Sequence, residues 1–168
     1  MLDPLFEATN SAVIEITGRG TEPGQTIEIF VNGDYKTKAL VDNDSEFTVP
    51  EFRLEQGENE IKAKAKFDNK ESEFSPEQIV IYENTPPALE VKEPTSGQTI
   101  KKTRNIRVAG KTEADANVSV NGLLPIVDSN GNFSYMFPLK DGENVIKVVA
   151  TDRAGNQTTN EIKVTFEP

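Results

Sequence analysis

The chain has 168 residues, of which 35% are hydrophobic and 27% charged, and its net charge is −10. This acidity disfavours nucleic acids and anionic membranes as partners, because both are bound through basic surfaces. The sequence contains no cysteine, histidine or tryptophan, which excludes disulfides, thiol catalysis, Cys/His zinc sites and a serine–histidine triad.

No membrane segment or export signal is expected in these residues. No apolar run approaches the roughly 20 residues that a membrane-spanning helix needs. The opening residues Met1-Leu2-Asp3-Pro4 lack the basic start and apolar core of a signal peptide. If the parent protein is exported, we expect this chain to be an excised piece of it that carries an added methionine.

The first half of the chain has the pattern of short strands separated by turns. Residues 27–29 alternate apolar and polar side chains, and Asn32-Gly33 supplies the positive φ values that a two-residue hairpin requires. Further along, residues 61–67 alternate apolar side chains with lysines. A period of two predicts a strand with one face on a core and the other in water. A helix would scatter the same lysines around its whole circumference.

Two consecutive prolines near the middle of the chain mark a domain boundary. Pro86-Pro87 directly follow Asn84-Thr85. Prolines cannot donate to a sheet ladder and hold φ near −65°, so they form a short, stiff connector. We therefore expect two domains, residues 1–84 and 85–168, in a semi-rigid connection.

The second half repeats the pattern of the first. Residues 41–47 (VDNDSEF) correspond to residues 127–133 (VDSNGNF), and GENEIK at 57–62 corresponds to GENVIK at 142–147. Upstream, residues 14–18 match residues 106–110, and we align Thr21-Glu22 with Thr112-Glu113. A repeat of roughly 90 residues is too long for a solenoid unit and fits a whole small domain.

Short strands with turn signals every 8–12 residues or so indicate antiparallel β-sandwiches. We expect an all-β chain of two tandem sandwiches, each with about seven strands. The expected core of the first consists of Ile14, Ile16, Ile27, Ile29, Phe47, Leu54, Ile61, Ala63, Ala65, Ile79 and Ile81. The expected core of the second consists of Ile106, Val108, Val118, Val120, Phe133, Leu139, Ile146, Val148, Ala150, Ile162 and Val164.

Several segments of the second half resemble a known family. Residues 108–112 (VAGKT) and 118–122 (VSVNG) look like its opening strands, and residues 150–156 (ATDRAGN) look like its last hairpin. The chain resembles tandem bacterial immunoglobulin-like domains, including the type that accompanies glucodextranase-like enzymes. This resemblance implies immunoglobulin-like sandwiches outside the cell, as stalks, adhesive arms or accessory domains of surface enzymes. In the first half, residues 67–71 (FDNKE) replace the family's Asp-x-Ala-Gly-Asn turn.

The acidic segment from Asp42 to Glu46 admits three interpretations. Its oxygens could bind calcium, although it lacks the glycine and the distant glutamate of an EF-hand loop. Asp42 and Asp44 could act as an acid–base pair, but a solvated hairpin tip would leave both with ordinary acidity. Because Asp and Asn more often stabilise turns by bonding their own backbone, we favour a turn. We expect no catalytic, cofactor-binding or metal-binding residues.

Two further groups of side chains could bind polymers. Lys62, Lys64 and Lys66 form a basic stripe that could meet an acidic polymer, although such lysines more commonly form a solvated sheet face or protect an exposed edge. Aromatic side chains could stack on sugar rings, although those at 135 and 137 share a strand face and could equally be packing. The aromatic candidates are Tyr35, Tyr82, Tyr135 and Phe137.

The expected function is therefore that of a non-enzymatic extracellular spacer, or stalk, in a bacterial surface or secreted protein. We expect a monomeric part of a longer chain, with no cofactor, no nucleic-acid partner and no membrane insertion. Two alternatives stay open. One is an adhesive module that binds carbohydrate or protein, with a polysaccharide or a surface protein as partner. The other is an accessory domain of a surface enzyme that acts on glycosides.

Overall fold

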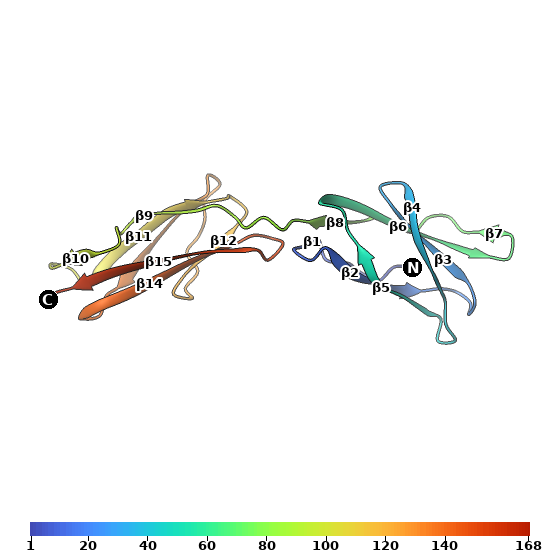
Figure 1. Cartoon of the computed structure of the whole chain (residues 1–168), viewed down its shortest axis with the longest axis horizontal. Helices are drawn as coiled ribbons and strands as arrows, with labels where there is room; N and C mark the ends of the chain where they lie inside the picture. Colours follow the sequence, from blue (N-terminus) through green and yellow to red (C-terminus); the bar gives the residue numbers. More distant parts are fainter. The chain divides into compact units, whose positions relative to one another are not determined.

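The computed structural model describes all residues, 1–168, and divides into two compact units, Met1–Asn84 and Thr85–Pro168. Both units consist of strands joined by turns and loops, with no helix (Figure 1). The chain is thus all-β, as the residue alternation predicts. In each unit, two sheets pack face to face around a core of their own.

The first unit contains eight strands. Their bounds are Ala8–Thr9 (β1), Val13–Arg19 (β2), Thr26–Val31 (β3), Asp34–Leu40 (β4), Glu46–Arg53 (β5), Gly57–Phe67 (β6), Lys70–Glu71 (β7) and Gln78–Tyr82 (β8). One sheet has the strand order β1-β8-β6-β3-β4, and the short β7 also pairs with β6. The other sheet pairs β2 with β5.

The second unit contains seven strands. Their bounds are Leu89–Glu93 (β9), Gln98–Ile100 (β10), Asn105–Thr112 (β11), Asn117–Val120 (β12), Asn132–Pro138 (β13), Gly142–Thr151 (β14) and Gln157–Phe166 (β15). One sheet has the order β10-β15-β14-β12 and the other the order β13-β11-β9. The second unit has no counterpart of β4, because the chain beyond β12 makes only isolated bridges through Leu123 and Val127.

Most strand pairs are antiparallel, but each unit has one short parallel pair. In the first unit β1 runs parallel to β8, with Ala8 opposite Ile81. In the second, β10 runs parallel to β15, with Gln98 opposite Val164. In both cases a strand near the start of the unit lies beside the unit's last strand.

The alternating strands supply the cores as expected. Ile61 and Ala63 are buried on β6, and Ile146, Val148 and Ala150 are fully buried on β14. The other expected core residues that are buried are Ile16, Ile27, Ile29, Phe47, Leu54, Val108, Val118, Val120, Phe133, Leu139, Ile162 and Val164. Three more are partly buried and pack against the cores, namely Ile14, Ala65 and Ile106.

The expected burial of Ile79 and Ile81 is wrong. These side chains are 45% and 41% exposed, whereas Val80 between them is only 1% exposed. The ladder places Val80 opposite Asn59 on β6, just as Val164 lies opposite Asn144 on β14. The run Ile79-Val80-Ile81 is apolar throughout, so its sequence does not indicate which residues face inward.

The alignment of Thr21 with Thr112 is also wrong. The backbone N–H of Gly20 donates to the carbonyl of Ser45, and that of Thr112 donates to the carbonyl of Gly131. Both acceptors have positive φ and belong to equivalent turns. Gly20 is therefore the structural counterpart of Thr112.

The Asn32-Gly33 turn forms as predicted, and Asn121-Gly122 forms the equivalent turn in the second unit. Asn32 and Asn121 have φ values of 52° and 48°, and the glycine after each also has positive φ. Each asparagine also reaches the neighbouring strand. The side-chain oxygen of Asn32 accepts from the N–H of Glu60 at 2.9 Å, and that of Asn121 accepts from the N–H of Lys147 at 2.6 Å.

A buried asparagine fixes the crossing between the two sheets in each unit. Asn59 is 0% exposed, and its amide accepts from the N–H of Glu55 at 2.9 Å and donates to the carbonyl of Glu55 at 2.8 Å. Asn144 makes the same pair of bonds with Lys140, both at 2.8 Å. Glu55 lies between β5 and β6, and Lys140 lies between β13 and β14. Each of these bonds is therefore made where the chain crosses from one sheet to the other.

Replacing either asparagine with alanine leaves partly buried backbone N–H and carbonyl groups without these partners. We expect Asn59→Ala to destabilise the first unit, and Asn144→Ala the second, by about 1–3 kcal/mol each. Urea unfolding followed by residue-resolved NMR separates the two units. Asn43→Ala, at an exposed turn position, is the matched control. Equal stability of all three variants would show that these amides do not hold the crossing.

Candidate functional site

The segment from Asp42 to Glu46 is a turn closed by its own carboxylate. Asp42 Oδ1 accepts hydrogen bonds from the backbone N–H groups of Asp44 and Glu46, both at 2.9 Å. The backbone of Ser45 donates to the carbonyl of Asp42 at 3.2 Å, and Ser45 has a φ of 63°. The carboxylate therefore serves the backbone, as the turn interpretation requires.

The equivalent turn of the second unit is built in the same way. Asp128 Oδ1 accepts from the N–H groups of Asn130 and Asn132, both at 2.9 Å. The side-chain amide of Asn132 also donates to both carboxylate oxygens of Asp128. The N–H and amide of Asn132, followed by the N–H of Asn130, hold the pKa of Asp128 below its ordinary value, because they stabilise the ionised form.

A third copy of this turn joins β14 to β15. Asp152 Oδ1 accepts from the N–H of Asn156 at 2.8 Å, and Asp152 Oδ2 accepts from the Asn156 amide at 2.8 Å. The signal is visible in the sequence, because residues 128–132 (DSNGN) and 152–156 (DRAGN) share the pattern Asp-x-x-Gly-Asn. The sequence analysis did not connect the two. No group of three or more acidic side chains lies close enough to hold a metal ion.

The lysine stripe of β6 is paired with glutamates from the chain beyond it. Lys62 Nζ lies 2.6 Å from Glu77, and both Lys64 and Lys66 pair with Glu71. Hydrogen bonds to these carboxylates raise the pKa values of Lys62 and Lys64, and hydrogen bonds from Lys64 and Lys66 lower the pKa of Glu71. The stripe is therefore locally neutralised and offers no unpaired row of cations to an acidic polymer.

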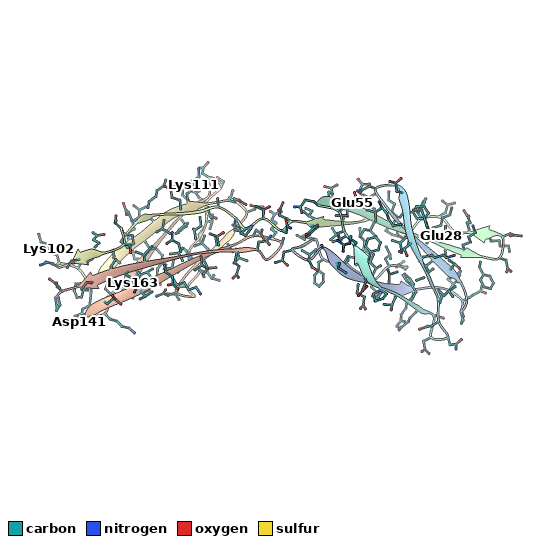
Figure 2. The ribbon with its side chains drawn as sticks, in the orientation of Figure 1. Glu28, Glu55, Lys102, Lys111, Asp141 and Lys163 are labelled. Carbon is teal, nitrogen blue, oxygen red and sulfur yellow. The ribbon has the colours of Figure 1, made fainter.

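Other charged side chains lie at the surface of both units. Figure 2 shows several of them, namely Glu28, Glu55, Lys102, Lys111, Asp141 and Lys163. All but Glu28 are exposed. They come from different strands and loops.

The aromatic candidates do not form a flat platform for sugars. Tyr35 is 52% exposed, but its ring meets Phe30 edge-on at an interplanar angle of 74°. Phe74 contacts the same phenylalanine at 88°. The remaining three, Tyr82, Tyr135 and Phe137, are partly buried and pack against the cores. In each of these T-shaped pairs the edge of one ring meets the face of the other, so the rings do not lie side by side as one open flat surface for a sugar.

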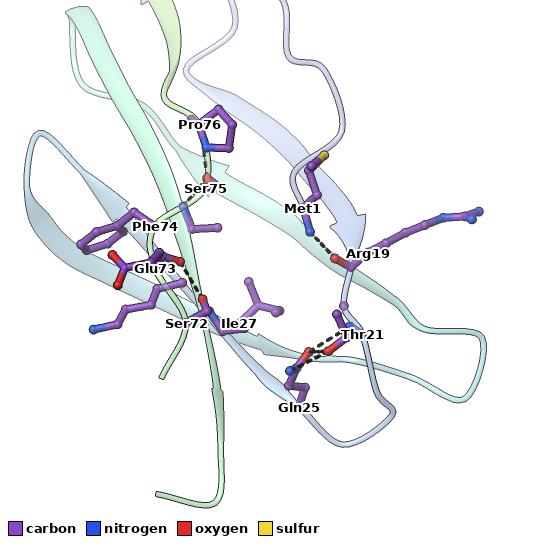
Figure 3. Close-up of a pocket in the computed structure, with 14 residues that line it drawn as sticks. Met1, Arg19, Thr21, Gln25, Ile27, Ser72, Glu73, Phe74, Ser75 and Pro76 are labelled. Carbon is purple, nitrogen blue, oxygen red and sulfur yellow. Dashed lines mark hydrogen bonds between the residues drawn. The ribbon is translucent and has the colours of Figure 1, made fainter. Parts of the chain in front are cut away.

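A groove with a mostly apolar lining lies in the first unit beside the end of β2 (Figure 3). Its volume is about 310 Å³, and its apolar lining includes Ile27, Ala63 and Ala65. The opposite wall is the segment 72–76, where the chain leaves the ladder between β7 and β8. The sequence analysis missed this groove.

Side-chain hydroxyls complete the ladder beside the groove. Ser75 Oγ accepts from the N–H of Ala63 at 3.0 Å, and Ser72 Oγ accepts from the N–H of Ala65 at 2.9 Å. Both hydroxyls donate to nearby backbone carbonyls. These serines thus act as substitutes for strand backbone. The apolar lining of the groove can accommodate an apolar side chain. Neither serine contacts a base that would activate it as a nucleophile.

One loop of the second unit exposes large aliphatic side chains. Leu124 is 76% exposed and Ile126 is 89% exposed, and Leu123 beside them is 47% exposed. Ile126 also lines a shallow depression with Arg107 and Ser134. Exposed aliphatic side chains gathered in one loop are a feature of protein-binding surfaces.

Comparison with known proteins agrees with this geometry. Residues 87–167, nearly all of the second unit, match the family described as glucodextranase, domain B. Bacillopeptidase F of Bacillus subtilis (strain 168) is 34% identical to the chain over 165 residues, which is 95% of this chain and 11% of that protein. The PII-type proteinase of Lactococcus lactis subsp. cremoris is 39% identical over 71 residues, 42% of this chain and 4% of that protein. The chain therefore spans only a small part of the curated relatives that it matches.

A solved structure shares the fold. The fibronectin(III)-like modules of Clostridium thermocellum CbhA superpose with a TM-score of 0.64 at 14% identity, covering 99% of this chain and 93% of that one. The structure contains no helix with the length and hydropathy that a membrane crossing requires. The chain is therefore built from immunoglobulin-like, fibronectin III-like β-sandwich domains, and its second unit matches glucodextranase domain B.

Proposed function

We propose that the chain is a non-enzymatic spacer within a longer extracellular protein. The observation that carries this proposal is the parallel pairing of β1 with β8 and of β10 with β15. Because paired strands of the same direction start at one end of a sheet and finish at the other, the chain enters each unit at one end and leaves it at the opposite end. Each unit therefore adds its length to the chain.

The length that each unit adds follows from its longest strands. β6 has 11 residues and β14 has 10. At about 3.3 Å per residue, strands of this length span roughly 33–36 Å. A unit that adds this length to the chain, and whose charged side chains are bound in ion pairs and turns, is suited to holding other parts of a protein at a distance.

The hydrogen bonding of the polar side chains also supports the spacer function. Every buried side-chain nitrogen or oxygen has a hydrogen-bond partner, and the carboxylates of Asp42, Asp128 and Asp152 serve turns. Catalytic groups usually sit in clefts with strongly shifted acidity and unsatisfied bonds that a substrate completes. The shifts here come from surface ion pairs and turn closure.

Module replacement in the longer protein tests the spacer proposal. We expect that an unrelated pair of fibronectin III-like domains, put in place of these 168 residues, keeps the parent protein's activity, because a spacer acts through its length. Deletion of the segment lowers that activity. Loss of activity in the replaced protein, equal to that of the deletion, contradicts the spacer function.

The exposed loop at 123–126 favours a second candidate, a protein-binding module. If this loop binds a partner, the double variant Leu124→Ser, Ile126→Ser lowers activity in the parent protein as much as the deletion does. Both side chains are highly exposed, so the variant keeps its fold. The spacer proposal predicts that this variant retains full activity.

Thermal unfolding with added ligands tests the spacer function on the chain alone. A ligand that binds only the folded state at a hundredfold excess over its Kd adds about 2.7 kcal/mol, a shift of several degrees. We expect the Tm to stay constant with calcium, with EDTA and across a panel of cell-wall and plant polysaccharides. A shift with any polysaccharide replaces the spacer with a carbohydrate receptor, and a shift with calcium overturns the assignment of Asp42 to a turn.

The pH dependence of stability tests the turn at Asp128. A lowered pKa in the folded state contributes stability that is present above the ordinary value of 3.8 and is lost as the pH falls through the folded value. We therefore expect Asp128→Asn to lower the Tm of the second unit at pH 7, with the difference from wild type closing below about pH 3.8. Asp44→Asn is the control, because the carboxylate of Asp44 accepts none of the turn's hydrogen bonds. A pH-independent difference would contradict the role of the ionised carboxylate.

A further inference from the structure

The net charge of the chain lies entirely in its first unit. Residues 1–84 contain 18 acidic and 8 basic side chains, whereas residues 85–168 contain 10 of each. Two copies of the first unit therefore repel one another. A first unit meets a second unit without this repulsion, so the charges favour contact between unlike units when two copies of the chain associate.

The outer face of β8 carries an apolar pair that the second unit lacks. The register around the buried asparagines makes Ile79 the counterpart of Lys163 and Ile81 the counterpart of Thr165. Both isoleucines are exposed. Because the second unit has polar side chains at the same positions, the fold itself does not require isoleucine on this face.

Carboxylates without ion pairs border the apolar pair. Glu60 lies opposite Ile79 on the neighbouring β6, and Glu58 lies opposite Ile81, so the four side chains share one face of the sheet. Glu58 is exposed and Glu60 is half-buried. The lysines of β6 pair with other glutamates, and neither Glu58 nor Glu60 takes part in an ion pair. These four residues form the acidic apolar face of the first unit.

The loop at 123–126 gives the second unit an apolar surface with cations beside it. Arg107 lines the same depression as Ile126. Lys147 lies beside the start of the loop, where its backbone carbonyl accepts from the preceding turn at 2.8 Å. Both cations are exposed, and neither takes part in an ion pair. Asp128 also lines the depression, but its carboxylate is bound by its own turn.

We propose that the loop at 123–126 of one copy docks on the acidic apolar face of a second copy of this chain. The aliphatic side chains of the loop cover the isoleucines of β8, and the cations beside the loop approach the glutamates of β6. The two surfaces match in charge and in apolar character. Because the contact joins two different surfaces, it is a heterologous one.

This contact goes beyond the spacer function and does not rest on it. It names a partner for the exposed loop, and it leaves the length of each unit unchanged. It replaces the monomer expected from the sequence with a reversible association. The association is weak, because each surface offers only a few apolar side chains.

Sedimentation equilibrium of the purified chain tests the contact. We expect the weight-average mass to rise as the protein concentration is raised into the millimolar range. The variant Ile79→Lys, Ile81→Thr carries the residues that the second unit has at these positions, so it keeps the fold, and it stays monomeric. The variant Leu124→Ser, Ile126→Ser also stays monomeric. A wild-type chain that remains monomeric over the whole range overturns the proposal.

Mixing these two variants tests whether unlike surfaces meet. Each variant keeps the surface that the other has lost. We therefore expect an equimolar mixture to form a one-to-one complex, although neither variant associates with itself. A mixture that stays monomeric, while the wild-type chain associates, overturns the proposal, because the contact then joins some other pair of surfaces.

Reversal of charge tests the polar part of the contact. We expect Glu58→Lys, Glu60→Lys to weaken association by roughly tenfold or more, because like charges then meet across the interface. Adding Arg107→Glu, Lys147→Glu to the same chain restores association, since both surfaces are then reversed.

The matched control changes the same charge elsewhere in the first unit. Glu15 and Glu51 are exposed and lie on the other sheet, on β2 and β5. We expect Glu15→Lys, Glu51→Lys to leave association at least as strong as in the wild type. Equal weakening by this control and by the reversal at Glu58 and Glu60 overturns the proposal, because it shows an effect of net charge alone.

Discussion

The buried asparagine on the central strand of each unit is the interaction on which the two-sheet arrangement depends. The chain leaves one sheet at the end of β5 and joins the other at the start of β6, and Asn59 holds both the N–H and the carbonyl of Glu55 between them. Asn144 does the same after β13. A buried amide with several partners has few alternative positions, so it fixes where the central strand starts. That start sets the register of every strand paired with it.

Intramolecular bonds also occupy many of the charged side chains at the surface. Acidic side chains that suggest calcium or hydrolysis in the sequence are bound to the N–H groups of their own turns, as Asp42 and Asp128 show. The lysines of β6, whose spacing suggests a binding site for an acidic polymer, form ion pairs with Glu71 and Glu77. The net charge of −10 is thus spread over turns and strand faces, and it favours solubility.

Periodic signals made most of the fold predictable, and local departures from periodicity account for the rest. Residues 61–67 define both faces of β6, and the duplicated turns locate matching strands in both halves. The run Ile79-Val80-Ile81 carries no period, so only its pairing with β6 reveals that Val80 faces inward. The groove depends on where segment 72–76 leaves the ladder and on what lies beyond β2, and neither feature has a sequence pattern. Turn chemistry was recognisable in the sequence, whereas the shape of the groove was not.

The parallel pairing of early and late strands also bears on how each unit responds to tension. If the two ends of a unit are pulled apart, β1 slides along β8, and β10 slides along β15. The bonds between them, such as that from the N–H of Glu167 to the carbonyl of Ile100 at 2.9 Å, lie across the pulling direction and are loaded together. A hairpin pulled from its open end instead loses its bonds one after another. A domain with this topology therefore resists stretching more strongly than a hairpin does, because rupture requires several bonds to break at once.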